Sequence, residues 1–135
     1  MASPNQTLEV TDPANGLRLL VEQDNTLPTL KILLPGQRAS ERGIEVLFPE
    51  HVTVREHGRS QPEHLYLWRP GQYGKRPDWR QVGQSLEYTM DLKRIHMVAR
   101  ATLEPDGVLF HYSFKNHSTV DYDMLEAITD PRLYT

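Results

Sequence analysis

The sequence predicts an all-β protein folded as an antiparallel β-sandwich, and three observations support this fold class. Ten prolines and eight glycines cut the 135 residues into runs of strand length. Apolar and polar side chains alternate along the last three of these runs, as expected for strands with one buried face. Short turn sequences join the same three runs. At most one short helix is expected, near residues 118–128 or 37–42.

The expected strands follow one another at short intervals. In chain order they cover residues 7–11, 17–23, 29–34, 44–48, 51–56, 64–68, 85–92, 95–103 and 108–116. The length is near the commonest size of one domain, so residues 1–135 are expected to form a single domain.

The last three expected strands form a meander whose register follows from their apolar rows. The connection at 93–94 has two residues, and the one at 104–107 has the Glu-Pro-Asp-Gly sequence of a type I turn. Keeping the apolar residues on one face pairs Leu92 with Ile95 and Leu103 with Val108. On the opposite, solvated face this register predicts three cross-strand rows: Glu87, Arg100 and His111; Thr89, Val98 and Ser113; and Asp91, His96 and Lys115. Opposite charges are neighbours in two of these rows, as a solvated face favours.

The segment 122–128 is the ambiguous element. Val120, Met124 and Ile128 fit helical spacing, and Ser118 with Asp121 resembles a capping box. A strand is favoured, because a short connection after Asn116 would return the chain to the same sheet.

Composition excludes several functional classes. The formal net charge is −3 with no basic patch, so no nucleic-acid partner is expected. The chain has no cysteine, which excludes disulfides and thiolate chemistry. The N-terminal sequence lacks the features of a signal peptide, and no apolar run is long enough to cross a membrane. A soluble, cytoplasmic protein without a membrane partner is therefore favoured, and the oligomeric state is left undetermined.

Three Glu-His pairs, at 50–51, 56–57 and 63–64, raise the question of a metal site. Along an extended strand, His51 and His57 would lie about 20 Å apart, too far to share one ion. A bend at Gly58 would have to bring His57 beside His64. We therefore expect no tightly bound metal and no other cofactor.

No residue is assigned a catalytic role. His111 shares a row with Arg100, but no nucleophile accompanies it. The segment 117–123 contains the residue types of a hydrolytic triad, in His117, Ser118, Asp121 and Asp123. Such triads are recognised by geometry rather than by closeness in sequence, and the chain has no Gly-x-Ser-x-Gly motif.

The segment 65–80 is the strongest candidate for a binding site. It holds both tryptophans, two tyrosines and four cations against one aspartate, in a stretch broken by proline and glycine. Its rings would stack on a sugar or contact a protein partner, or else they are structural; stacking on nucleobases is the least favoured interpretation. The predicted ligand-binding residues are Trp68, Tyr73, Trp79 and Arg80. Trp68 is expected to be half-buried and Trp79 exposed.

The stretch 108–118 is an alternating aromatic strand that ends in Phe-x-Asn-x-Ser, after a Pro-Asp-Gly turn. Over residues 85–130 the chain resembles galactose mutarotase-like supersandwich domains and the accessory β-sandwich domains of some glycoside hydrolases. The resemblance implies a sandwich-like sheet and an association with carbohydrate. It transfers no catalytic residue, because the mutarotase histidine and glutamate belong to strands without a counterpart here. At this length the chain would correspond to a fragment or half of a supersandwich.

Taken together, the sequence favours a non-enzymatic β-sandwich module that binds carbohydrate. Two alternatives remain open. One is a fragment of a sugar-acting hydrolase or isomerase, and the other is a structural or protein-interaction domain that pairs through its sheet edges. An uncovered apolar sheet face would favour the last of these.

Overall fold

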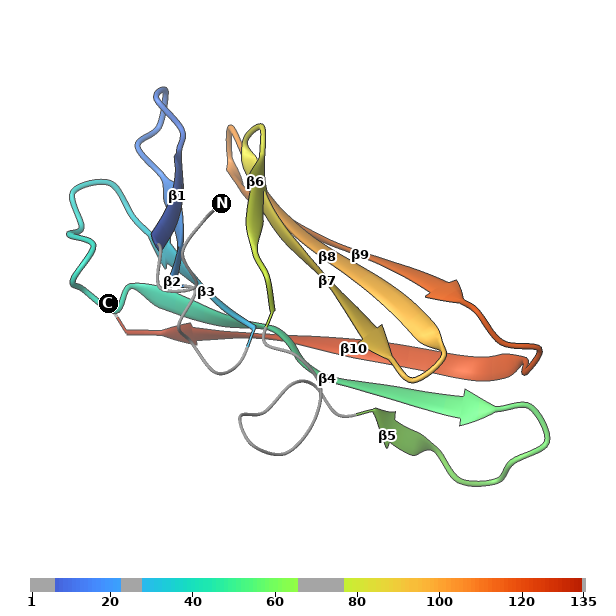
Figure 1. Ribbon diagram of the computed structural model, residues 1–135. Helices are drawn as coiled ribbons and strands as arrows, with labels where there is room; N and C mark the ends of the chain where they lie inside the picture. The colour runs from blue at the N-terminus through green and yellow to red at the C-terminus, as the bar shows by residue number, and fades with distance from the viewer. Residues whose placement is uncertain (1–6, 23–27, 66–76, 135) are drawn as a thin grey trace.

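The computed structural model describes residues 7–22, 28–65 and 77–134 and shows an antiparallel β-sandwich. Two sheets pack face to face (Figure 1). The described residues form ten strands and no helix, which confirms the predicted fold class. In this part of the chain there is accordingly no helix suited to crossing a membrane.

The larger sheet has six strands. Its order is β1-β2-β3-β4-β10, and β5 pairs with the second half of β4. The bounds are β1 Thr7–Thr11, β2 Arg18–Glu22, β3 Thr29–Leu33, β4 Ile44–Glu56, β5 Glu63–Leu65 and β10 Tyr122–Leu133. The runs expected at 44–48 and 51–56 are therefore one long strand, which exchanges β3 for β5 as its neighbour near Pro49. Trp68, at the end of the run expected at 64–68, lies outside the described residues.

The smaller sheet has four strands in the order β6-β7-β8-β9. Its strands are β6 Arg80–Val82, β7 Ser85–Leu92, β8 Ile95–Glu104 and β9 Gly107–Asn116. The predicted meander is confirmed pair by pair, including Leu92 with Ile95, Leu103 with Val108, and the row of Glu87, Arg100 and His111. Only β6 was absent from the prediction, because its residues stand in a sequence rich in proline and glycine.

The C-terminal segment is a strand, as favoured, but its predicted sheet is wrong. β10 does not return to β9; it crosses to the larger sheet and pairs along β4, with Leu125 opposite Val54 and Ala127 opposite Val52. The hydrogen bond from the backbone N–H of His57 to the carbonyl of Asp121 helps to hold the crossing chain against the end of β4. Consecutive strands β9 and β10 thus lie on different sheets (Figure 1).

The core between the sheets is organised around Phe48. Its ring lies 4.9 Å from Phe110 and 5.0 Å from Tyr112, measured between ring centroids, and 6.3 Å from Tyr88. On β8, Ala99 lies between Tyr88 and Tyr112, and Ala101 lies beside Phe110. Both alanines are fully buried. Two alanines on the central strand leave the space that a large ring from the opposite sheet needs.

Trp79 belongs to this core, so its expected exposure is wrong. Its side chain is 4% exposed, and its ring centroid lies 4.6 Å from that of Tyr88 and 6.3 Å from that of Phe48. Trp79 immediately precedes β6, where side chains alternate, so its ring points inward while Arg80 points outward. The prolines and glycines before it suggested a surface loop, but the chain has re-entered the sandwich by residue 79.

We predict that Trp79→Ala lowers the free energy of unfolding by about 3–5 kcal/mol, because it removes a large buried ring and leaves a cavity. Val82→Ala, three residues along the same segment at a side chain that is 41% exposed, is the control and should change it by about 0.5 kcal/mol or less. Urea unfolding measures both. A loss below about 1 kcal/mol for Trp79→Ala would contradict the packing described.

Candidate functional site

The four residues predicted to bind a ligand do not form a platform among the described residues. Trp68 and Tyr73 lie outside the described ranges, and Trp79 is buried in the core. Of the two that the structure describes, Arg80 is the one on the surface, with a side chain that is 66% exposed. Arg80 is held at one end of a charged row that runs across the smaller sheet.

This row contains a buried carboxylate, although the sequence predicted a solvated face. The side chain of Glu87 is 3% exposed. Nε of Arg80 donates to its Oε1 at 2.8 Å, and Nε of Arg100 donates to its Oε2 at 2.7 Å. The Nη2 atoms of the same two arginines lie 2.8 and 2.6 Å from those oxygens. The strands on either side of β7 each supply one guanidinium, so that the carboxylate is covered from both sides.

The two arginines also determine the charge state of Glu87. Burial by itself would raise the pKa of this carboxyl, but the hydrogen bonds from Arg100 and Arg80 outweigh burial and hold the pKa below its usual value. A group whose pKa is lowered by folding stabilises the fold above its ordinary pKa and loses that contribution as the pH falls through the lowered value. The row is therefore a stabilising ionic network at neutral pH.

One hollow on the described surface, of about 520 Å³, lies at one end of the sandwich. Glu56, Arg59, Glu63 and Lys93 line it, with residues 60–62. Its charges pair with one another: Lys93 contacts Glu63, and Arg59 lies 3.6 Å from Glu56. Because Lys93 belongs to the β7–β8 turn and Glu63 begins β5, the contact between them ties the two sheets together, whereas the contact of Arg59 with Glu56 lies within the β4–β5 hairpin. The charged side chains that line this hollow therefore link the sheets rather than form a ligand pocket.

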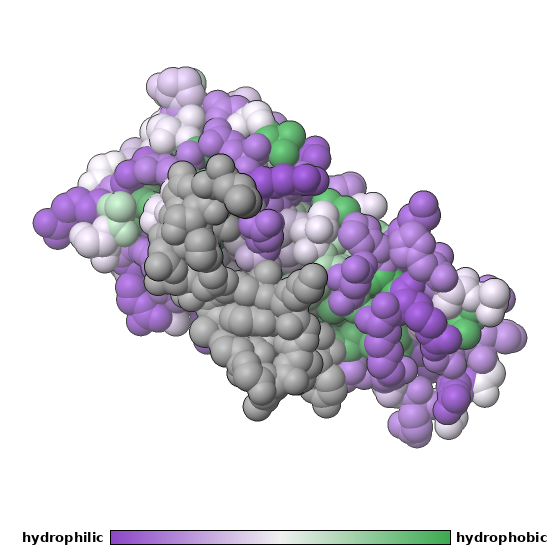
Figure 2. Space-filling view, viewed as in Figure 1, coloured by the Kyte–Doolittle hydropathy of each residue, from purple (hydrophilic) through white to green (hydrophobic). Residues whose placement is uncertain are grey.

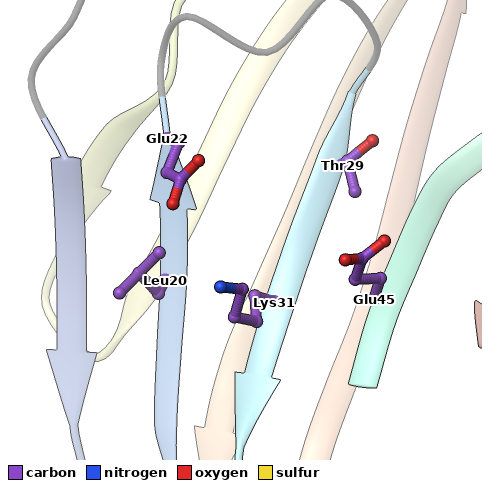
Figure 3. Close-up of a pocket in the computed structure, with 5 residues that line it drawn as sticks. All are labelled: Leu20, Glu22, Thr29, Lys31 and Glu45. Atoms are coloured by element: carbon purple, nitrogen blue, oxygen red, sulfur yellow. The ribbon is translucent and has the colours of Figure 1, made fainter. Parts of the chain in front are cut away.

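The second hollow lies on the outer face of the larger sheet and has a volume of about 210 Å³. Figure 3 shows Lys31 between side chains of β2 and β4, with Glu45 on one side and Leu20 and Glu22 on the other. Its main charges are already engaged: Nζ of Lys31 donates to the carbonyl of Ala39 at 3.0 Å, and Glu45 accepts from Arg42 at 3.1 Å. The volume is below the roughly 300–1,000 Å³ of a typical ligand pocket.

Two residues of the suggested triad contact residues outside it. Asp123 contacts Nδ1 of His57 at 3.1 Å rather than His117. The hydroxyl of Ser118 donates to Asn116 at 2.6 Å. The His57 and Asp123 side chains are 73% and 42% exposed, so their pair lies in solvent. No catalytic arrangement is built by these contacts.

The remaining candidate is the open edge of the smaller sheet. Among the described residues, β9 pairs with β8 alone. The N–H of His117 donates to the carbonyl of Arg94, and the N–H groups of alternate residues on an antiparallel strand point the same way. The N–H and C=O groups of Leu109, His111 and Ser113 therefore point to β8, and those of Phe110, Tyr112 and Phe114 point out from the sheet edge.

The inner side chains along this edge are incompletely covered. Phe110, Tyr112 and Phe114 face the core but are only half-buried, whereas the facing positions on β8 are fully buried or nearly so. Leu125, on the inner face of β10, is 39% exposed. In the space-filling view hydrophilic residues dominate the surface and hydrophobic ones show only in small patches (Figure 2). We call the row of Phe110, Tyr112 and Phe114, together with its unpaired backbone, the β9 edge.

One contact spans the sheets behind this edge. The hydroxyl of Tyr112 lies 2.6 Å from the hydroxyl of Thr129 on β10. Burial raises the pKa of Tyr112 to about 12, so the phenol keeps its proton at neutral pH. This bond limits how far the sheets separate there. The alternating pattern of β9 places its aromatic row in the core, but the pattern does not show that the row lies at a sheet edge.

We predict that Glu87→Gln lowers the free energy of unfolding by about 1–3 kcal/mol at pH 7, because it weakens hydrogen bonds to a buried charged group. The difference from the parent should shrink as the pH is lowered from 7 to 3, since the unfolded parent then takes up a proton on Glu87 that the folded carboxylate, with its lowered pKa, resists. Asp91→Asn, at an acid that is 77% exposed, is the control and should cost about 0–1 kcal/mol. A difference that stays constant over this pH range would contradict the network.

Comparison of the chain with protein-family models, with curated proteins and with solved structures found no match. The resemblance to mutarotase-like domains therefore stays a prediction, and any function has to be argued from the geometry of this chain.

Proposed function

We propose that the chain is a non-enzymatic β-sandwich module that assembles edge to edge, with β9 of one copy pairing antiparallel to β9 of a second copy. The observation that carries the proposal is the β9 edge, where outward backbone groups and half-buried aromatic side chains occur together. An unpaired edge of this kind is a template for a further strand.

The β9 edge is less protected than the β10 edge. Natural sheets guard their edges with charged residues and prolines. β10 carries Pro131 and the acids Asp123, Glu126 and Asp130, whereas β9 has no proline and Lys115 as its one residue with a permanent charge. Strand addition is therefore favoured at β9.

Charge and side-chain pairing favour a second copy as the occupant. A two-fold axis through Tyr112 uses the outward backbone groups of Phe110, Tyr112 and Phe114. Phe110 of one copy then lies opposite Phe114 of the other, and Leu109 lies opposite Lys115. This register places no like charges opposite each other and extends the aromatic row across both copies.

We predict that the chain forms a dimer whose affinity depends on the charge at position 109. Leu109 is 53% exposed and points away from the core, so its replacement should leave the monomer stable. Leu109→Lys would place a cation opposite Lys115 at two symmetric points, weakening the dimer about 2- to 30-fold at roughly 0.2–1 kcal/mol per pair. Leu109→Glu would place an anion there and should keep or strengthen the dimer.

Sedimentation equilibrium over a wide concentration range measures both variants against the parent. Leu133→Lys, at an exposed residue on β10, is the matched control and should leave the dimer unchanged. A parent chain that stays monomeric at about 1 mM, or equal weakening by the lysine and glutamate variants, would contradict the proposal.

Carbohydrate binding is retained as a second candidate on a single observation. Arg80 presents an exposed guanidinium whose orientation is held by Glu87, a suitable donor for sugar hydroxyls or acidic sugars. A glycan array that compares the parent with Arg80→Ala tests this candidate. The parent should bind glycans that the variant fails to bind, and a parent that binds no glycan would reject the candidate.

The sugar-acting enzyme alternative gains no support from the described histidine–acid contacts, which are solvent-exposed.

A further inference from the structure

Two histidines come together on the outer face of the larger sheet. The ring centroids of His51 on β4 and His64 on β5 lie 4.8 Å apart, with an angle of 39° between the ring planes. Thr53, directly opposite His64, has its Oγ1 3.4 Å from Nδ1 of that ring. This pair corrects the expectation that histidine pairing here would require His57.

The β4–β5 hairpin creates the pair. Residues 57–62 reverse the chain, and the register sets Thr53 opposite His64 and Val52 opposite Leu65. Val52 and Leu65 fill the core, so Thr53 and His64 project outward, as does His51 two residues before Thr53. His51 is thereby the diagonal neighbour of His64, within reach of a long side chain.

The sequence contained a signal for this arrangement. Gly58 and Pro62 are turn residues that stand between the runs expected at 51–56 and 64–68. Treating the two runs as one hairpin would have paired His64 with residues near Thr53. The distance along a single strand excludes an ion shared by His51 and His57, but it does not apply to His51 and His64, which lie on neighbouring strands.

We propose that His51 and His64 form a two-histidine site for a divalent transition metal ion, with Cu²⁺ favoured over Ni²⁺ and Zn²⁺. Imidazole is a suitable ligand for all three ions, and the order of affinity follows the general series for nitrogen ligands. A hydroxyl beside a ligating histidine helps to orient its ring, as outer partners of metal ligands commonly do.

The site is a labile one that completes its coordination with water. Within the described ranges, no group of three or more histidine, cysteine or acidic side chains is placed to hold an ion. The charges nearby largely offset one another: Arg55 follows Thr53 on the same face of β4, and Glu126 of β10 lies opposite Thr53. Glu63, next to His64, is engaged with Lys93. Metal binding would join β4 to β5 and stabilise the hairpin.

The experiment uses the untagged chain and the metal ions alone. Titration with Cu²⁺, Ni²⁺ and Zn²⁺ at pH 7.5 is followed by calorimetry, and Mg²⁺ serves as the negative control. NMR of the imidazole protons identifies the ligands, because Cu²⁺ should broaden the signals of His51 and His64 before those of the other histidines. At pH 5 the affinity should fall, since a protonated imidazole cannot bind metal.

His51→Asn and His64→Asn should each weaken Cu²⁺ binding at least tenfold. His111→Asn, at an exposed histidine of the other sheet, should leave the affinity unchanged. The NMR measurement on the parent keeps the test valid if a variant folds poorly. Equal broadening of all histidines, or an affinity that His51→Asn leaves unchanged, would overturn the proposal.

Discussion

The contact on which the rest of the structure depends is the hydrogen bond that the Tyr88 hydroxyl donates to the carbonyl of Phe48 in the centre of the core. Phe48 stands where β4 leaves β3 and joins β5, and, among the described residues, 48–50 are missing from the strand pairing, although the N–H of Phe48 donates to the carbonyl of Pro28. A carbonyl left without a ladder partner in a dry core would be costly. Burial raises the pKa of Tyr88 well above its usual value, so the phenol remains a donor. This one hydrogen bond therefore satisfies the carbonyl of Phe48 and also joins the two sheets.

The aromatic side chains around Phe48 explain why the sandwich is dense in the middle and open at one side. Trp79, Tyr88 and the small residues of β8 enclose the ring, and the larger sheet covers them. The crossing of β10 to the larger sheet leaves β9 without a second neighbour among the described strands (Figure 1). The proposed assembly follows from this geometry: the core requires aromatic residues on β9, and the topology leaves them at an edge. The proposed metal site has a separate origin, in the hairpin that occupies the second half of β4.

The parts of the fold that could be predicted from sequence are those governed by neighbouring residues. The register of β7, β8 and β9 follows from two short turns and one alternating pattern, and every predicted pair is present. The sheet of β10 depends on an open edge of β4, about 70 residues earlier, which no local pattern reveals. The burial of Trp79 and Glu87 depends on which strands lie beside them. The prolines and glycines before Trp79 and the charges around Glu87 predicted instead that both side chains would be exposed to solvent. The pairing of His51 with His64 depends on a hairpin whose turn residues are visible in the sequence but do not fix its register.

Amide hydrogen exchange along β9, followed residue by residue at two protein concentrations, tests the central claim most directly, namely that β9 is an open edge closed by a second copy. The amides of Leu109, His111 and Ser113 should exchange slowly at both concentrations, because they are bonded to β8. The amides of Phe110, Tyr112 and Phe114 should exchange rapidly in dilute solution and slowly at high concentration, where the second β9 covers them. Even-numbered amides that exchange rapidly at both concentrations would contradict the assembly. Protection of the same amides in dilute solution would show that the edge is already covered within one chain.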